Sequence, residues 1–162
     1  HAKGATFDLI TTVEDSLGLL WEGESRMLCR GVKLEGETPE QSLPTTNTVS
    51  ELTRWQAPSD IGRRYARVSG DYNPIHLSAL TAKLFGFPQA IAHGLWNKAR
   101  TVAALHEHLP AANIEIYVEF KKPVRLPGQV ILLSSAPGSG GELQLKGDGD
   151  IEHMLGKWQP IA

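Results

Sequence analysis

An aspartate and a histidine five positions apart, Asp71 and His76, are the residues of this chain best suited to acid–base chemistry. They lie in the stretch 65–76, which reads Y-A-R-V-S-G-D-Y-N-P-I-H and ends at His76. Gly70 permits unusual backbone angles, while Pro74 fixes its own φ and pushes Asn73 towards an extended conformation. On so constrained a turn, a carboxylate and an imidazole can share one water molecule, as general acid–base catalysis requires. From the residues alone, a tight turn in which Asp71 caps the next helix is an equal alternative.

Size and composition are those of an ordinary globular chain. The 162 residues suit one domain or one domain with an appendage, and the net charge of −2 gives no nucleic-acid signature. No apolar run approaches the ~20 residues of a membrane span, and the start H-A-K-G-A-T-F has no signal-peptide core. Because it also lacks an initiator Met, we expect a trimmed chain. The single cysteine, Cys29, suits a reducing compartment, so we expect a cytoplasmic protein.

The first part of the chain predicts an antiparallel hairpin. Residues 6–15 and 19–30 are rich in β-branched and aromatic residues, with a Ser and a Gly between the two runs. A hairpin alone is marginal in water, so it must lie against something else. A polar, Gly- and Pro-containing segment without periodicity then predicts a linker at 37–49. We therefore expect N-terminal strands within 1–36 and a main domain at 50–162.

The main domain predicts an α+β layout. It opens with a short strand and two short helices, and a long buried helix follows at 91–109, ended by a proline. The apolar positions of that helix repeat with the helical period at Ile91, Leu95, Ala99, Val102 and Leu105. Alternating apolar residues then predict strands at 113–121, 129–135, 142–146 and 151–158. A helix packed against an antiparallel sheet accounts for this order.

Three stretches carry a family resemblance. The stretch ending at His76 resembles the signature of the MaoC-like dehydratases, which include the (R)-specific enoyl-CoA hydratases (hydratase 2). I-A-H-G-L at 91–95 is similar to the family's opening of the central helix, and F-K-K-P-V with L-P-G at 120–128 is similar to its later strand and turn. The matches fall in order over about 50–158. The resemblance implies the hotdog fold, an antiparallel sheet wrapped round a long central helix, here with an extra N-terminal β-hairpin.

The resemblance also implies a reaction. Members of this family add water to trans-2-enoyl thioesters to give (R)-3-hydroxyacyl thioesters, or catalyse the reverse dehydration. By the family's motif, Asp71 and His76 are the catalytic pair and Asn73 supports them. The backbone N–H of Gly94 donates to the thioester oxygen, where a helix N-terminus favours negative charge. No metal or redox cofactor is needed.

Further residues are candidates for binding the substrate. Lys122 and Arg125 are expected near the phosphates of coenzyme A or of an acyl-carrier protein, with a solvated surface as the alternative. His93, directly before Gly94, is expected to contact the substrate. In the alternative role, it is a helix-start residue that forms only local hydrogen bonds.

No metal site is expected from the remaining histidines. His106 and His108 are two positions apart on a predicted helix and point to different faces, whereas a helical metal site needs ligands four apart. His153, in the last predicted strand, is expected at the surface as well.

A second hotdog is the expected partner of this chain. Family sites commonly form where two hotdogs pair, so a homodimer or a pseudo-dimer with a second hotdog is expected. Residues 1–36 resemble the last strands of a degenerate first half, as in double hotdogs. The competing hypothesis is a non-catalytic acyl-thioester-binding or assembly module. A hotdog thioesterase would need a carboxylate at the central helix, and the sequence over 91–104 has none.

Overall fold

The computed structural model describes residues 4–36, 43 and 49–161, and the chain divides into two compact units, His1–Ser42 and Leu43–Ala162. Most of the linker predicted at 37–49 lies outside the described residues. Within the part that is described, no helix is long and apolar enough to cross a membrane.

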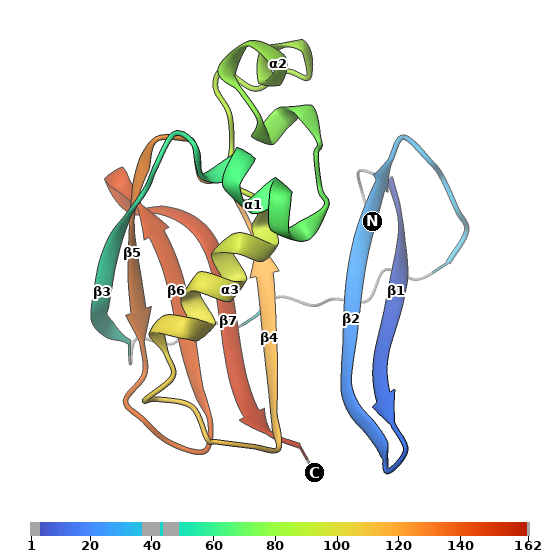
Figure 1. Cartoon of the computed structure of the whole chain (residues 1–162), viewed down its shortest axis with the longest axis vertical. Helices are drawn as coiled ribbons and strands as arrows, with labels where there is room; N and C mark the ends of the chain where they lie inside the picture. The colour runs from blue at the N-terminus through green and yellow to red at the C-terminus, as the bar shows by residue number, and fades with distance from the viewer. Residues whose placement is uncertain (1–3, 37–42, 44–48, 162) are drawn as a thin grey trace. The chain divides into compact units, whose positions relative to one another are not determined.

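The first unit contains the predicted hairpin, which is confirmed. Strand β1 (Gly4–Asp15) pairs antiparallel with β2 (Gly18–Arg30) as a two-stranded sheet (Figure 1). Phe7 lies opposite Met27 and Val13 opposite Trp21, so these side chains share one face of the ribbon. The alternation of apolar and polar residues along both strands therefore gives the hairpin one apolar face.

The second unit is built on a five-stranded antiparallel sheet in the order β3-β5-β6-β7-β4. Helix α3 lies across one face of this sheet (Figure 1), which is the predicted arrangement of helix and sheet. Alternation again sets the strands, since Val130, Leu132 and Ser134 of one strand are buried. The strands are β3 (Ser50–Ala57), β4 (Ile114–Phe120), β5 (Gly128–Ser134), β6 (Gly141–Gly147) and β7 (Ile151–Pro160).

Short helices lie at one end of the sheet. These are α1 (Ile61–Ser69), the 3-10 turn η1 (Pro74–His76) and α2 (Ala79–Leu84), with a second 3-10 turn, η2 (Asp148–Asp150), between β6 and β7. Gly70 ends α1 in the left-handed conformation, at φ 75°, which glycine adopts without strain. The hydroxyl of Ser78 starts α2 by accepting a hydrogen bond from the N–H of Thr81 at 3.1 Å.

The central helix is shorter than the sequence predicts. Helix α3 spans Gly94–Ala104, so the prediction of one helix over 91–109 was wrong at both ends. Ile91 instead forms an isolated antiparallel bridge with Arg125, and the extended backbone of His93 delays the start of the helix. Beyond Ala104 the chain forms turns.

The face of α3 that meets the sheet also differs from the prediction. Leu95 is 59% exposed, whereas Asn97 and Thr101 are buried. Because α3 follows directly from the buried His93, the residues four and eight positions later share its inward face. The predicted apolar stripe through Leu95 and Ala99 therefore lies on the exposed side. The core consists mainly of sheet residues, including Trp55, Val130, Leu132, Leu143, Leu145, Met154 and Trp158.

Candidate active site

The turn after α1 holds Asp71 and Asn73 through short local hydrogen bonds. The main-chain N–H of Asp71 donates to the hydroxyl of Ser69 at 3.2 Å, and the N–H of Asn73 donates to Oδ1 of Asp71 at 3.1 Å. Oδ1 of Asn73 in turn accepts from the N–H of Ile75 at 3.3 Å, which caps η1. Asn73 is thus the helix cap, and the side chain of Asp71, 53% exposed, keeps its second oxygen free of this turn.

His76 is held by the strand-like segment that precedes α3. Its side chain is 8% exposed, and Nδ1 lies 2.8 Å from the main-chain oxygen of Ile91. Since a carbonyl oxygen only accepts, Nδ1 carries the proton and donates, and Nε2 keeps its lone pair. The N–H of Ile91 donates back to Ile75 at 3.1 Å, so η1 and this segment fix each other. The imidazole is therefore oriented as a base.

The environment of His76 keeps the ring neutral. Burial lowers the pKa of His76, and this outweighs the hydrogen bond to Ile91, which raises it. Nearby His93 lowers the pKa of His76 further, while the carboxylate of Asp71 raises it. Because the ordinary value of a histidine is about 6.5, the ring is unprotonated at neutral pH and able to accept a proton.

His93 connects the turn to the start of α3. The ring is 3% exposed and stacks on the ring of His76 at 3.7 Å between centroids. Its Nε2–H donates to the main-chain oxygen of Asp71 at 3.0 Å, and Nε2 is 3.8 Å from Oδ2 of the same residue. Local hydrogen bonding, the alternative for His93, is therefore what the geometry shows, and its contact with substrate stays a prediction.

Three potential ligand atoms, one each from Asp71, His76 and His93, lie within 4.8 Å of one another. A water hydrogen-bonded to two groups bridges up to about 5.6 Å, so one water can contact Asp71 and His76 together. Two imidazoles and a carboxylate are also donors for a divalent transition metal. Nδ1 of His76 and Nε2 of His93 already donate to carbonyl groups, so only the other ring nitrogens are open to such an ion.

Gly94 is the first residue of α3, where main-chain N–H groups have no partner within the helix. The first turn of α3 has no acidic residue to oppose an anion. A Cβ at Gly94 would lie 3.2 Å from the ring of Phe120, so glycine admits this ring close to the helix start. The sequence order places this N–H directly beside His93.

The predicted phosphate-binding residues lie at the surface. Lys122 and Arg125 are both exposed, and Arg125 reaches the site through its main-chain bridge to Ile91. The carbonyl of Lys122 accepts from Nδ1 of His153 at 2.9 Å. His153 is only 8% exposed, so its expected surface position was wrong, because this hydrogen bond draws the ring inward. Phosphate binding by either cation stays a prediction.

Sequence reasoning missed two contributors. Gly62 on α1 leaves no room for a side chain, since a Cβ there would overlap the carbonyl oxygen of His76. The other is the main-chain oxygen of Ile91, which sets the tautomer of His76. A main-chain acceptor has no signature in the sequence, and the glycine in α1 was the only signal for the close approach.

The chain is similar in sequence to known dehydratases. The chain is 36% identical over 149 residues to 3-hydroxyacyl-thioester dehydratase X of Mycobacterium tuberculosis. The aligned part makes up 90% of this chain and 52% of that relative. It is 40% identical over 65 residues to the 3-hydroxybutyryl-CoA dehydratase of Methylorubrum extorquens, or 38% of this chain and 41% of that relative. The chain thus spans about half or less of the length of these two curated relatives.

Solved structures and a family model agree with these relatives. The crystal structure of HtdX from M. tuberculosis matches at TM-score 0.80 and 30% identity, over 99% of this chain and 64% of that one. A MaoC-like dehydratase from Phytophthora capsici matches at TM-score 0.82 and 23% identity, over 98% and 59%. These likenesses confirm the hotdog fold. Because residues 32–137 match the model of the MaoC like domain, the chain belongs to the MaoC-like dehydratase family.

Proposed function

We propose that this chain carries the catalytic hotdog of a hydro-lyase, which adds water to trans-2-enoyl thioesters to give (R)-3-hydroxyacyl thioesters, or runs the reverse dehydration. The observation that carries the proposal is the neutral, oriented His76 within 4.8 Å of the Asp71 carboxylate. This is the geometry in which one water is held by two proton acceptors. The names of the relatives, two of them dehydratases of 3-hydroxyacyl thioesters, support the same chemistry.

The pair works on one side of the substrate. In the hydration direction, the water oxygen bonds to C3 as the water gives up a proton to the Asp71–His76 pair. The pair then delivers a proton to C2 from the same side. Both parts of the water end on the substrate, and the pair returns to its starting protonation state. Asn73 contributes by fixing the turn, since its N–H holds Oδ1 of Asp71.

Negative charge that develops on the thioester oxygen needs a hydrogen-bond donor. The N–H of Gly94 is the proposed donor, because the start of α3 combines a free N–H with the positive end of the helix dipole. We propose His93 beside it as a contact for the bound thioester. Its ring lies between the Asp71 turn and the helix start.

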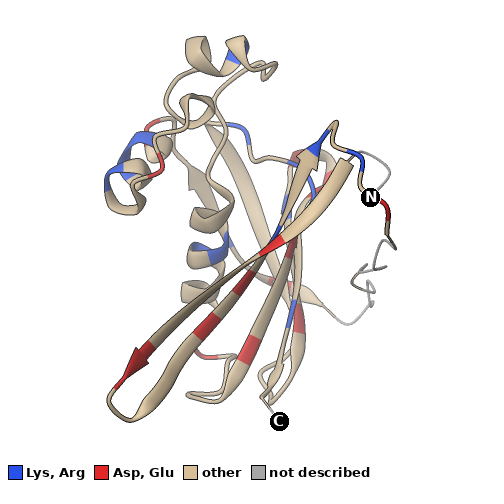
Figure 2. Cartoon of the chain, turned by 90° about the vertical axis from the view of Figure 1, so that its right-hand side faces the viewer, with Lys and Arg blue, Asp and Glu red and all other residues tan. Residues whose placement is uncertain are grey.

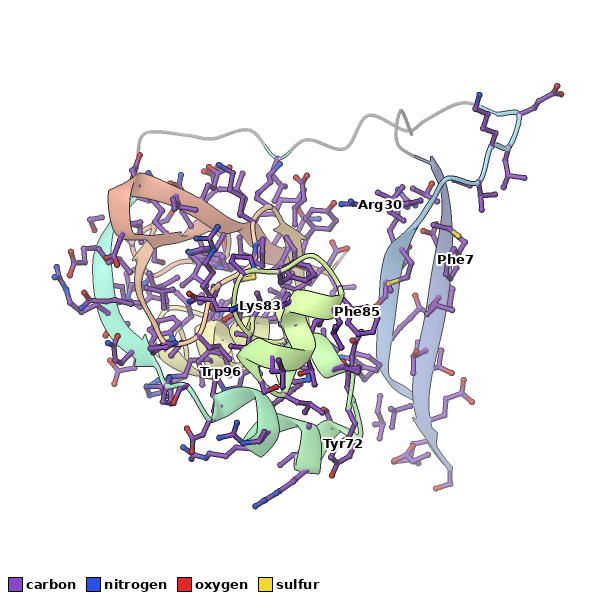
Figure 3. The ribbon with its side chains drawn as sticks, turned by 90° about the horizontal axis from the view of Figure 1, so that it is seen from above. Phe7, Arg30, Tyr72, Lys83, Phe85 and Trp96 are labelled. Carbon is purple, nitrogen blue, oxygen red and sulfur yellow. The ribbon has the colours of Figure 1, made fainter. Side chains whose placement is uncertain are left out.

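Coenzyme A or an acyl-carrier protein is the proposed carrier of the acyl group. Helices α1, α2 and α3 each carry Lys or Arg residues, which are blue in Figure 2. Lys122 and Arg125 add further exposed positive charge. Apolar residues accompany them, since Leu80, Leu84 and Phe85 are 77%, 80% and 58% exposed. Figure 3 shows Lys83, which lies on α2, and Phe85, which directly follows α2. The phosphates of such a carrier would pair with the exposed cations.

Hydration of crotonyl-CoA, followed by the loss of its enoyl absorbance, tests the proposal. We expect Asp71→Asn and His76→Gln each to lower kcat by about 10²–10⁴-fold, the range of general acid–base groups. His153→Gln serves as the matched control, because it removes a buried imidazole on β7 away from the Asp71 turn. Full activity in both site variants would disprove the assignment. Binding of crotonyl-CoA without turnover by the wild type would favour the non-catalytic binding module.

The assembly is part of the proposal. We propose that a second hotdog, in a homodimer or a pseudo-dimer, covers the exposed side of α3, where Leu95 is 59% exposed and Ala99 is also exposed. Light scattering that gives only the mass of one 17.7 kDa chain would argue against the homodimer. We further propose that residues 1–36 are the last strands of a degenerate first hotdog half, in a cytoplasmic protein that is longer than this chain. An intact mass of the natural protein near 17.7 kDa would exclude the longer protein.

A further inference from the structure

Three buried polar side chains follow one another along the inward face of α3. His93 caps α3 with an extended backbone, and Asn97 and Thr101 follow at intervals of four on the helix. The three side chains are 3%, 5% and 0% exposed, and we call them the row. One atom of each is unpaired: Nδ1 of His93, Oδ1 of Asn97 and Oγ1 of Thr101 have no hydrogen-bond partner among residues 4–36, 43 and 49–161. A buried polar atom without a partner is unfavourable, and three in one row point to a shared ligand.

The chemistry of the three atoms restricts what that ligand is. Nε2 of His93 carries the proton, because it donates to the carbonyl of Asp71 at 3.0 Å, so Nδ1 is an acceptor. Oδ1 of Asn97 is an acceptor as well, and two acceptors cannot bond to each other. With the amide in this orientation, a molecule with two donor hydrogens satisfies both acceptors at once. The hydroxyl of Thr101 both donates and accepts, so the same kind of molecule fits the second gap.

The spacing selects a small molecule. Side chains four positions apart on a helix have Cβ atoms about 5–6 Å apart. Two hydrogen bonds of about 2.8 Å each, end to end, cover about the same distance. A water is therefore the size of molecule that suits each gap, in the way that buried waters pair otherwise unsatisfied polar groups.

We propose that α3 holds two buried waters, one between His93 and Asn97 and one between Asn97 and Thr101. The first water donates to Nδ1 of His93 and fixes the tautomer in which Nε2–H holds the main chain of Asp71. With the other tautomer, Nε2 would direct a lone pair at the Asp71 carbonyl and release the turn. Asn97 is thus a positioning residue, which acts on Asp71 through the water and His93. The consequence for activity rests on the proposed function; the water sites do not.

A crystal structure of the full chain at a resolution that shows waters tests the two sites directly. We expect one density peak within hydrogen-bond distance of each pair of atoms in the wild type. Asn97→Leu removes the shared acceptor and should lose both peaks. Thr101→Val, nearly identical in shape, should lose only the second peak, which makes it the matched control.

Nitrogen NMR of the histidine rings and the kinetics of crotonyl-CoA hydration supply the second readout. In the wild type and in Thr101→Val we expect His93 to be protonated at Nε2 and unprotonated at Nδ1. In Asn97→Leu we expect a mixture of tautomers and a loss of kcat of about tenfold, below the ~10²-fold cost of a 1 Å misplacement. KM should change less than kcat, because Asn97 does not touch the substrate.

The outcomes separate this inference from the proposed function. A dry row in the wild type, with the Asn97 amide turned to donate directly to Nδ1 of His93, would overturn the inference even if the enzyme is active. Both waters present in a wild type that converts no enoyl thioester would uphold the inference and count against the proposed function. If Asn97→Leu does not fold, density in the wild type and in Thr101→Val still decides.

Discussion

The two units of this chain use the same strand pattern with opposite results. In the hotdog unit, Leu132 and Met154 are fully buried between the sheet and its covering residues. In the hairpin, Leu9 is 51% and Trp21 53% exposed, although β1 and β2 are also paired along their length as antiparallel strands. Alternation makes a strand, but only a second layer buries its apolar face. Among the described residues, the second unit therefore has a hydrophobic core of its own, whereas the apolar face of the hairpin remains about half exposed.

The two faces of the hairpin differ in kind. One face carries Phe7, Leu9, Val13, Trp21 and Met27, all about half exposed. The other carries an ion pair across the strands, in which Nε of Arg26 lies 2.7 Å from Oδ1 of Asp8. Because the pair stands on the polar face, water is expected there, and the apolar face is the one that a second layer of protein would cover.

The largest expected effect comes from a glycine pair, one in each unit. Gly62→Ala places a methyl group on the carbonyl oxygen of His76, and a main-chain oxygen cannot move without shifting η1 and the Asp71 turn. We expect a loss of more than about 4 kcal/mol in stability and of about 10²-fold in kcat. Urea unfolding and crotonyl-CoA hydration measure the two effects.

Gly23→Ala in the hairpin is the matched control. There the three atoms nearest to the added methyl group all belong to the end of the Trp21 side chain, which can rotate away. We expect this variant to change stability by less than about 1 kcal/mol and to leave kcat unchanged. Equal losses in the two variants would mean that the hairpin is packed as tightly as the hotdog unit, and the comparison would fail.

A pair of leucine truncations gives the next largest effect. Leu132→Ala removes a fully buried side chain from the sheet and should lower the free energy of unfolding by about 2–5 kcal/mol. Leu9→Ala, on the half-exposed face of the hairpin, should change it by about 0.5 kcal/mol or less. Urea denaturation of both variants measures the difference. A loss above about 2 kcal/mol for Leu9→Ala would show that the face is already covered.

The sequence predicts the features that depend on neighbours along the chain. Alternation of apolar and polar residues predicted the strands of both units. The constrained turn predicted that the side chains of Asp71 and His76 lie close together. The inward face of α3 was not predictable, because Leu95 follows the apolar period while buried Asn97 does not. The start of the helix at Gly94, set by the contacts of the preceding segment, decides which residues point inward.

The orientation of the candidate site depends on contacts that are distant in sequence. The main-chain oxygen of Ile91, fifteen positions from His76, fixes the tautomer of the base. The same holds for His93, whose partner is a carbonyl group twenty-two positions away. Any residue can supply a carbonyl oxygen, so residue types indicate which groups are candidates for the chemistry but not which atom of each is available.

The smallest expected effect is a pH dependence of stability that belongs to the hotdog unit alone. Burial lowers the pKa of His76 and of His153, and residues 4–36 contain no histidine. An unfolded histidine binds a proton below about pH 6.5, while the folded rings resist it to a lower pH. Stability contributed by the two neutral rings is therefore complete above pH 6.5 and is lost as the pH falls through their lowered pKa values.

Urea unfolding at several pH values between 7.5 and 5 measures this loss. His153→Gln should remove part of the pH dependence of stability and leave the pH dependence of crotonyl-CoA hydration unchanged, because this ring contacts Lys122 rather than the turn. His76→Gln should remove another part of it together with the activity. A wild-type stability that stays constant across this range would contradict the burial of both rings in neutral form. If a variant that lacks both His76 and His153 kept the full pH dependence of stability, this dependence would belong to other titratable groups.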